Sequence, residues 1–370
     1  MRVCDSFLVA LAAEFQVSTG DASGVISGFA IAYGLMQLVY GPLADSVGKV
    51  RVIVFATLGC MVFSVLTALA PSLNLLVMAR AGLGALAAGI IPLSLAWIGD
   101  QVSYDKRQET LAKLTAATVS GMMVGQWLGG LAAETVGWRF ALGGLSLVFA
   151  TAAVLLLRSA DLSAPATAQL DTSGQGILAR QFGATAKLLA HAKVRGLLLI
   201  TIVHGALSFG TLAFIPSRLI GGFGFSVSTA GAIMVLYGVG GLAYSQMARR
   251  LVAALGERGL CMVGAGLFAS AMLVLAWASQ PWLAVLACPI GGVGFYMLHG
   301  TLQTRATQIA PQARATAVSM FACLLFFGQS IGVWLMGKGV DQGAFALALS
   351  TTAIGVLIIG MIVASQTEKH

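Results

Sequence analysis

The sequence predicts an all-α integral membrane protein with twelve transmembrane helices in two six-helix bundles. Of the 370 residues, 58% are hydrophobic and only 9% are charged, whereas soluble domains carry about 25% charged residues. A helix needs roughly 20 mostly apolar residues to cross a bilayer. The apolar runs give twelve spans, at residues 1–16, 22–44, 50–70, 73–99, 111–134, 138–158, 194–218, 226–248, 258–278, 281–303, 315–337 and 342–365.

An internal repeat divides these spans into two sets of six. Matches occur at offsets of 203 to 205: Tyr-Gly at 33–34 and 237–238, Gly-Gln-x-x-Gly at 125–129 and 328–332, and Phe-Ala-Leu at 140–142 and 345–347. A near-constant period indicates duplicated halves. We expect an N-terminal bundle over 1–158, a linker over 159–193 and a C-terminal bundle over 194–370. The linker is rich in Ser, Thr, Pro and Gly and ends in an amphipathic stretch at 178–192, which is typical of a tether with a short surface helix; a regulatory site is the alternative.

The first helix is too short to span the membrane. Only eight uncharged residues lie between Asp5 and Glu14. A signal peptide is one interpretation, with Arg2 as its basic region and residues 7–13 as its apolar region, but Asp5 at the start of that region argues against it. We expect instead that the chain as given begins inside helix 1. Asp5 then lies about 13 Å below Glu14, close to the midplane of the bilayer.

Residues 41–51 join the second and third spans by a tight hairpin. Gly41, Pro42 and Gly48 are suited to a helix end and a sharp turn. Asp45 lies at the very end of a span, where it can meet a basic side chain or the N-terminus of another helix. Lys49 and Arg51 follow, and their charge marks the cytoplasmic side.

The net charge of +8 is explained by topology. With the N-terminus inside, sixteen lysines and arginines fall in or beside cytoplasmic segments, and only Arg139, Arg218 and Lys338 fall outside. This bias sets the orientation, with both termini of the full-length form in the cytoplasm. A nucleic-acid partner is not needed to explain the basic excess. We expect the bacterial inner membrane as the location.

Several function classes are disfavoured. The five cysteines, at positions 4, 60, 261, 288 and 323, all lie within spans and without CxxC spacing, so we expect packing residues rather than disulfides or zinc ligands. A GxxxxGK[ST] nucleotide loop, a cluster with metal-ligand spacing and a nucleophile motif are all absent from the sequence. We therefore predict a protein that is not an enzyme, needs no cofactor or metal, and draws any energy from a proton gradient.

Two ionisable residues inside the spans are candidates for chemistry, because burying one costs at least about 2.5–3.5 kcal/mol. A carboxylate at the position of Asp5 can load and release a proton as a cavity changes sides. Arg80 lies roughly 10 Å deep in the fourth span, and an Asp5–Arg80 pair would lower the cost of burying each. A non-native N-terminus for Asp5 and snorkelling for Arg80 are the alternatives.

Three stretches resemble motifs of the major facilitator superfamily. Residues 41–51 are similar to its loop between helices 2 and 3, G-x-L-a-D-r-x-G-r-(k)-x, with Ser46 in place of a base. Residues 80–84 resemble its helix-4 motif R-x-x-q-G, with Leu83 in place of Gln, and residues 121–130 resemble its antiporter motif g-x-x-x-G-P-x-x-G-G, with Gln126 in place of Pro.

The resemblance implies a secondary transporter with two rocking halves, most like the bacterial drug:proton antiporters. It implies proton coupling by Asp5 and Arg80 and a latch in which Asp45, with Lys49 and Arg51, joins helix 2 to helix 11. Gly125, Gly129 and Gly130 then bring helix 5 close to helix 8, or serve packing alone.

The substrate cavity is expected between the halves. His204 and His299 lie on helices that line the cavity in this superfamily and titrate near neutrality; satisfied neutral histidines are the alternative. Further candidate contacts are Tyr33, Gln37, Trp97, Tyr237, Phe295, Tyr296 and Gln303. We predict proton-coupled efflux of a drug or metabolite by a monomer. A sugar or metabolite transporter of the same fold is one alternative, and a non-transporting receptor or inactive remnant is another.

Overall fold

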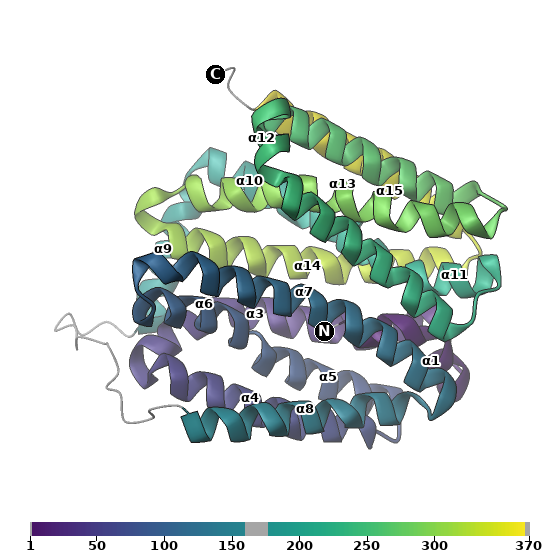
Figure 1. Cartoon of the computed structure of the whole chain (residues 1–370), viewed down its shortest axis with the longest axis horizontal. Coiled ribbons are helices and arrows are strands. Elements are labelled where there is room, and N and C mark those ends of the chain that lie inside the picture. The colour runs from purple at the N-terminus through teal and green to yellow at the C-terminus, as the bar shows by residue number, and fades with distance from the viewer. Residues whose placement is uncertain (1, 160–176, 367–370) are drawn as a thin grey trace.

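The computed structural model describes residues 2–159 and 177–366, and its regular structure is helical (Figure 1). The first half contains η1 (Val3–Phe7), α1 (Leu8–Phe15), α2 (Thr19–Ala22), α3 (Gly24–Val47), α4 (Lys49–Ala68), α5 (Leu73–Ala87), α6 (Ile90–Gln101), α7 (Tyr104–Thr135) and α8 (Trp138–Ser159). The second half contains α10 (Ala192–His204), η2 (Gly205–Gly210), α11 (Ile215–Phe223), α12 (Val227–Trp277), α13 (Pro281–Gln308), η3 (Pro311–Ala313), α14 (Arg314–Asp341) and α15 (Phe345–Ser365).

Nine segments of the described residues are long and apolar enough to cross a membrane. Twelve spans were predicted, and three of them are missing from this count of nine. The helix α12 contains two spans, α7 begins with charged turns, and η1 with α1 forms the short first helix. Each of α5–α6 and α10–η2–α11 is one span with an internal irregularity.

Two predicted connections are largely helical in the structure. The hairpin at 41–51 was expected to turn at Gly41, Pro42 and Gly48, but α3 continues through the first two to Val47, and the turn is made at Gly48 alone, with φ +102°. Likewise, the expected loop between 248 and 258 is helix up to Gly256, where φ is +62° and the direction changes. In both places a single glycine reaches the left-handed φ region that other residues avoid. A longer connecting loop between the helices is therefore not required.

Equivalent glycines in the two halves make equivalent contacts. A Cβ added to Gly129 of α7 would meet Val3 of η1, and one added to Gly332 of α14 would meet Ala206 of η2. Gly129 and Gly332 are 203 residues apart in the sequence, and so are Val3 and Ala206. The α3 glycine Gly34 packs on α14, just as Gly238 of α12 packs on α7. The halves therefore share one packing plan, which the repeat in the sequence predicted.

The halves meet along two helix pairs, α3 with α14 and α7 with α12. We call the end of the molecule with Glu14 and Asp341 the outer end, and the end with Gly48 and Asp100 the inner end, as the charge distribution predicts. Hydrogen bonds between the halves at the outer end join Asp341 to Ser18 and Gly20, and Glu134 to Ser228. The described structure is therefore closed at its outer end.

The inner end has fewer contacts of this kind. A Cβ added to Gly41, in the inner part of α3, would meet nothing within 4 Å. The helix α9 (Ile177–Ala190) lies there and contacts both α3 and α14. It is the described part of the predicted linker; residues 160–176 of that linker fall outside the described residues. Leu188 of α9 is buried in a cluster that includes residues of α10 and α14, and Leu38 of α3 packs against that cluster.

Candidate functional site

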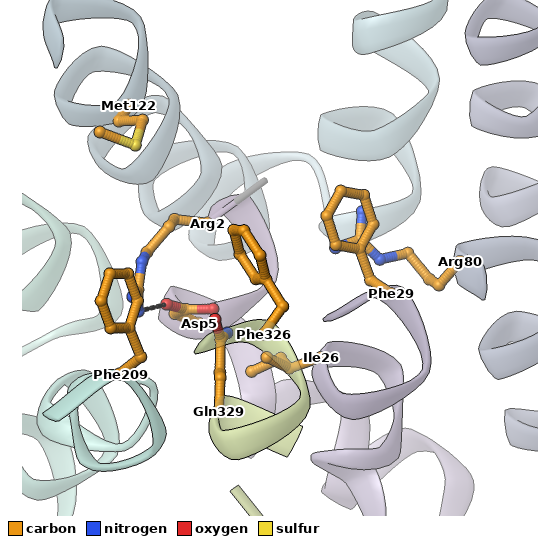
Figure 2. A pocket seen from close by; sticks show the side chains of 9 residues that line it. All are labelled: Arg2, Asp5, Ile26, Phe29, Arg80, Met122, Phe209, Phe326 and Gln329. Carbon is orange, nitrogen blue, oxygen red and sulfur yellow. Dashed lines mark hydrogen bonds and ion pairs between the residues drawn. The ribbon is translucent and has the colours of Figure 1, made fainter. Parts of the chain in front are cut away.

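A small cavity lies between the halves, and both contribute to its wall (Figure 2). It offers about 40 Å³ to the centres of water molecules, which is room for a few waters and far less than a drug-sized ligand needs. The first half supplies Arg2, Asp5, Ile26, Phe29, Arg80 and Met122, and the second half supplies Phe209, Phe326 and Gln329.

Asp5 is the acidic residue of this wall. It belongs to η1 and is only 1% exposed. Its carboxylate accepts a hydrogen bond of 3.0 Å from Arg2 Nη1 three residues earlier, which makes a buried ion pair. The Arg2 guanidinium also lies 5.4 Å from the ring centroid of Phe209, on η2 in the other half. Removing one member of such a pair leaves a buried charge uncompensated, which costs about 3–5 kcal/mol.

Arg80 lines the same cavity from α5 and is also 1% exposed. Its Nε donates to the backbone oxygen of Val25 at 3.4 Å, and its guanidinium lies 4.5 Å from the ring centroid of Phe29. Figure 2 shows Arg80 and Phe29 together, apart from the Arg2–Asp5 pair. The structure thus brings Asp5 and Arg80 to one cavity, as the sequence suggested, but the ion pair of Asp5 is with Arg2.

The two predicted histidines lie together inside the second half. The rings of His204 and His299 are stacked at 5.5 Å, and Phe295 stacks on both, at 5.9 and 5.3 Å. Phe209 meets Phe295 and His299 edge-on. His204 Nδ1 bonds to Ser208 Oγ at 3.2 Å. In the described structure His204 Nε2, His299 Nδ1 and the Tyr237 hydroxyl are buried without a hydrogen-bond partner, and such groups are costly unless a ligand or water pairs them.

The segment η2 explains how His204 and Phe209 come to face this cluster. It is a π-helix that begins directly after His204 and ends at Gly210. A π-helix has a wider turn than an α-helix, and π-bulges are frequent at functional sites. Gly205 and Gly210 pack against the backbone of α14. The widened turn therefore lies directly on α14, the helix of the second half that contacts α3.

The remaining predicted cavity residues divide into three groups. Tyr33 and Gln37 are buried in packing: Tyr33 contacts Phe29 and Phe326, and Gln37 Nε2 donates to the Ala88 oxygen at 3.1 Å. Tyr237 and Tyr296 flank Phe295 at 5.9 and 5.2 Å. Trp97, 40% exposed, and Gln303, also exposed, do not line the cavity described above.

The predicted gating residues are at the inner end and in α7. Lys49 forms an ion pair with Asp100 of α6, and Arg51, two residues further along α4, is half-buried. Asp45 is exposed and forms no hydrogen bond or ion pair with the described side chains. In α7, a Cβ on Gly129 or Gly130 would strike η1 or the Val227 oxygen of α12, whereas one on Gly125 would meet nothing within 4 Å.

Several site residues were not predicted from the sequence. Arg2 was considered only as part of a signal peptide, and Phe209, Phe326 and Met122 were not considered. Gln329 was not predicted as a site residue either, although it lies in the repeated Gly-Gln-x-x-Gly segment, which could have drawn attention to it. Among the described residues there is no cluster of three His, Cys, Asp or Glu side chains placed to hold a metal ion.

The sequence of this chain matches that of a known family. The family model described as Major Facilitator Superfamily covers residues 5–333. The multidrug efflux protein YfmO of Bacillus subtilis (strain 168) is 24% identical over 375 residues, covering 99% of this chain and 89% of YfmO. A probable sugar efflux transporter of Helicobacter pylori (strain HPAG1) is 21% identical over 312 residues, covering 84% of this chain and 77% of that protein.

Among solved structures, a mutant of the nucleoside transporter NupG superposes with a TM-score of 0.81 at 14% identity. The match covers 99% of this chain and 96% of NupG. This likeness confirms the predicted fold class, an all-α membrane protein with two related bundles of six helices.

Proposed function

The chain belongs to the major facilitator superfamily, and we propose that it exports a small molecule across the cytoplasmic membrane in exchange for protons. Membership makes it a multi-pass secondary transporter rather than an enzyme. The observation that carries the finer proposal is the buried carboxylate of Asp5, on the wall of a cavity built from both halves. The names of the relatives YfmO and the Helicobacter protein, both called efflux proteins, support the direction.

Asp5 is proposed as the proton carrier. In the outward-closed structure its ionised form is stabilised by Arg2. Protonation removes this attraction and releases Arg2, which changes the electrostatics on both sides of the cavity because Arg2 also contacts Phe209 of the second half. A hydrogen-bond donor on the substrate needs the deprotonated carboxylate. Proton and substrate then compete for one group, which is the requirement for exchange.

Substrate contacts are proposed to come from both halves. Arg80 and Phe29 present a cation and an aromatic face from the first half. His204, His299 and Tyr237 offer buried atoms that lack partners in the described structure, and Phe295 and Tyr296 surround them. Because the cavity is small in this conformation, we expect it to widen when the halves rock apart, as in alternating access.

The topology is also proposed. Residues 1–158 and 194–370 form the two moving halves, and 159–193 form the joint. Both termini of the full-length form are cytoplasmic, and the protein works as a monomer in the bacterial inner membrane. Asp45, with Lys49 and Arg51, latches α3 to the inner end of α14 in the outward-open state. Asp45 is exposed in the described conformation, and we expect the latch to be open there.

The test is proton movement in proteoliposomes. Purified protein is reconstituted with an acidic lumen, and a panel that contains ethidium, tetraphenylphosphonium, mono- and disaccharides is added outside. A compound that enters in exchange for protons raises the luminal pH, read with a trapped pH dye. We expect Asp5→Asn to abolish this signal while the protein still exchanges labelled compound for unlabelled compound, since the substitution removes the titrating group and little volume.

Glu109→Gln is the matched control, because Glu109 is an exposed acid of α7 that pairs only with Lys113 on its own helix among the described residues. It should transport as the unmodified protein does. Uptake of sugars without any pH change would instead favour the second candidate, a sugar or metabolite transporter of the same fold. Compounds that raise the melting temperature but are never transported would point to a receptor, and no response to any compound to an inactive remnant.

A further inference from the structure

The outer end of the molecule is closed by a carboxylate of the first half bound to the second. Glu134 lies in the last turn of α7. Its Oε2 accepts a hydrogen bond of 2.7 Å from the backbone N–H of Ser228, in the first turn of α12, which has Ser226 as its N-cap. An N–H in the first turn has no partner within its own helix. The Glu134 carboxylate therefore satisfies a group that would otherwise need water.

A second carboxylate makes the same kind of bond in the opposite sense. Asp341 is the last residue of α14, in the second half. Its Oδ1 accepts from the backbone N–H of Gly20 at 2.9 Å, and its Oδ2 accepts from Ser18 Oγ at 2.7 Å. Ser18 and Gly20 lie at the start of the chain segment that leads into α3.

The two contacts are related by the repeat. Glu134 and Asp341 differ by 207, Ser18 and Ser226 by 208, and Gly20 and Ser228 by 208. In each case an acid at the outer end of α7 or α14 binds the second residue after a serine N-cap, in the other half. Two chemically matched bonds on opposite sides of the interface resist opening of the outer end together.

The backbones come close at both contacts. A Cβ added to Gly130 would lie 2.8 Å from the Val227 oxygen, and one added to Gly337 would lie 2.8 Å from Gly20 Cα. These separations are shorter than any real Cβ contact, so each joint has no space for a side chain. Glycine allows the approach, and the carboxylate supplies the directional bond.

We propose that Glu134 and Asp341 are outer-gate residues of the transport reaction: their bonds to Ser228, Ser18 and Gly20 hold the outward-closed state and must break before the outer end opens. The assignment goes beyond the proposed proton exchange, because it requires alternating access but neither Asp5 nor a known substrate. Both acids are exposed at the surface, so their bonds can exchange with water as the halves separate.

The test measures the separation of the halves directly. Spin labels are placed at Leu69→Cys, at the outer end of α4, and Gln280→Cys, before α13; both positions are exposed, and all five native cysteines are buried. Pulsed electron resonance in lipid nanodiscs then gives the distribution of distances between the halves. Hydrogen bonds to a charged group are the stronger kind, so we expect each of Glu134→Ala and Asp341→Ala to raise the ratio of outward-open to outward-closed molecules at least about threefold.

The double variant should raise that ratio about tenfold, as expected when both bonds act on one equilibrium. Glu14→Ala is the matched control. Glu14 is also an outer-end acid, but it bonds to Trp138 and Arg139 within its own half, so its loss should leave the distribution unchanged. Glu134→Gln with Asp341→Asn keeps neutral acceptors and should give an intermediate shift. If the melting temperature shows that the double alanine variant does not fold, the double variant Glu134→Gln with Asp341→Asn takes its place in the test. A double variant with the distances of Glu14→Ala would overturn the proposal.

Discussion

The two halves have the same helix packing but different chemistry at the cavity. Gly129 against Val3 and Gly332 against Ala206 are the same contact made twice. At the cavity, however, the two halves differ: Asp5 of η1 lines the wall from the first half, and Phe209 of η2 lines it from the second. The first half contributes the charges of Arg2, Asp5 and Arg80, and the second contributes neutral aromatic rings.

The two halves therefore resemble each other in the residues that pack helices together and differ in the residues that line the cavity. Glycines facing a neighbouring backbone cannot change without strain, whereas a residue facing a hydrated cavity is constrained by the ligand only. We infer that ion coupling has become a property of the first half, and that the aromatic and histidine cluster of the second half contacts the substrate. Substitutions at equivalent positions can break or sharpen this division.

The largest expected effect concerns two equivalent glycines with unequal surroundings. A Cβ on Gly328 would overlap the Ile202 oxygen, whereas a Cβ on the equivalent Gly125 would meet nothing within 4 Å. Gly328→Ala should therefore lower the free energy of unfolding by about 2 kcal/mol or more, since overpacking typically costs 1–3 kcal/mol. Gly125→Ala should be neutral or stabilise by up to about 1 kcal/mol through helix propensity. Unfolding in mixed SDS micelles measures both. Equal losses would contradict the view that the antiporter-like motif packs through Gly129 and Gly130 rather than Gly125.

An intermediate effect is expected at the inner end, where the halves differ in sign of charge. Asp45 corresponds to Arg249 at the offset of 204. Asp45→Asn should leave the melting temperature unchanged and reduce transport about tenfold, the size of one charged hydrogen bond, because the latch that we propose for the outward-open state would lose its charge. Arg249→Gln should change transport less than twofold. Initial rates of uptake into vesicles, normalised to folded protein, are the measurement; unchanged transport by Asp45→Asn rules out the latch.

The smallest effect is expected from the candidate cavity residues that the structure leaves exposed. Trp97→Phe and Gln303→Ala should each alter transport less than twofold, because neither side chain lines the described cavity and exposed substitutions usually change little. Tyr237→Phe, which removes a buried hydroxyl that has no partner in the described structure, should weaken substrate affinity more, while stability is kept. A fall in transport for Trp97→Phe larger than for Tyr237→Phe would place the substrate path along α6 instead.

Much of the scaffold could be predicted from the sequence because it depends on local properties. Apolar length predicted the spans, and the repeat predicted the related halves. The turns were predicted less well. Pro42 suggested a helix end, yet α3 continues past it, since neighbouring helices stabilise a span beyond its weak positions. Similarly, residues 249–257 were left between two predicted spans, but the chain there is helical up to Gly256, and the arginines at 249 and 250 are good helix formers.

The site could be predicted only in part, because its partners are distant in sequence or belong to the backbone. Asp5 and Arg80 stood out as charges in apolar runs. Their joint presence at one cavity was predictable, but the partner of Asp5 was not, because Arg2 had no recognisable motif. Glu134 and Asp341 bind N–H groups, which every residue carries. No composition or spacing marks such an acid until the other half is folded against it.

The position of α9 has a consequence for how the movement of the two halves could be observed. Because α9 contacts α3 of the first half and both α10 and α14 of the second, any movement of the halves against each other at the inner end must change its contacts. A fluorophore on Lys187, or an antibody fragment that recognises α9, would then report each turnover as a change in its own environment, without a label on any moving span.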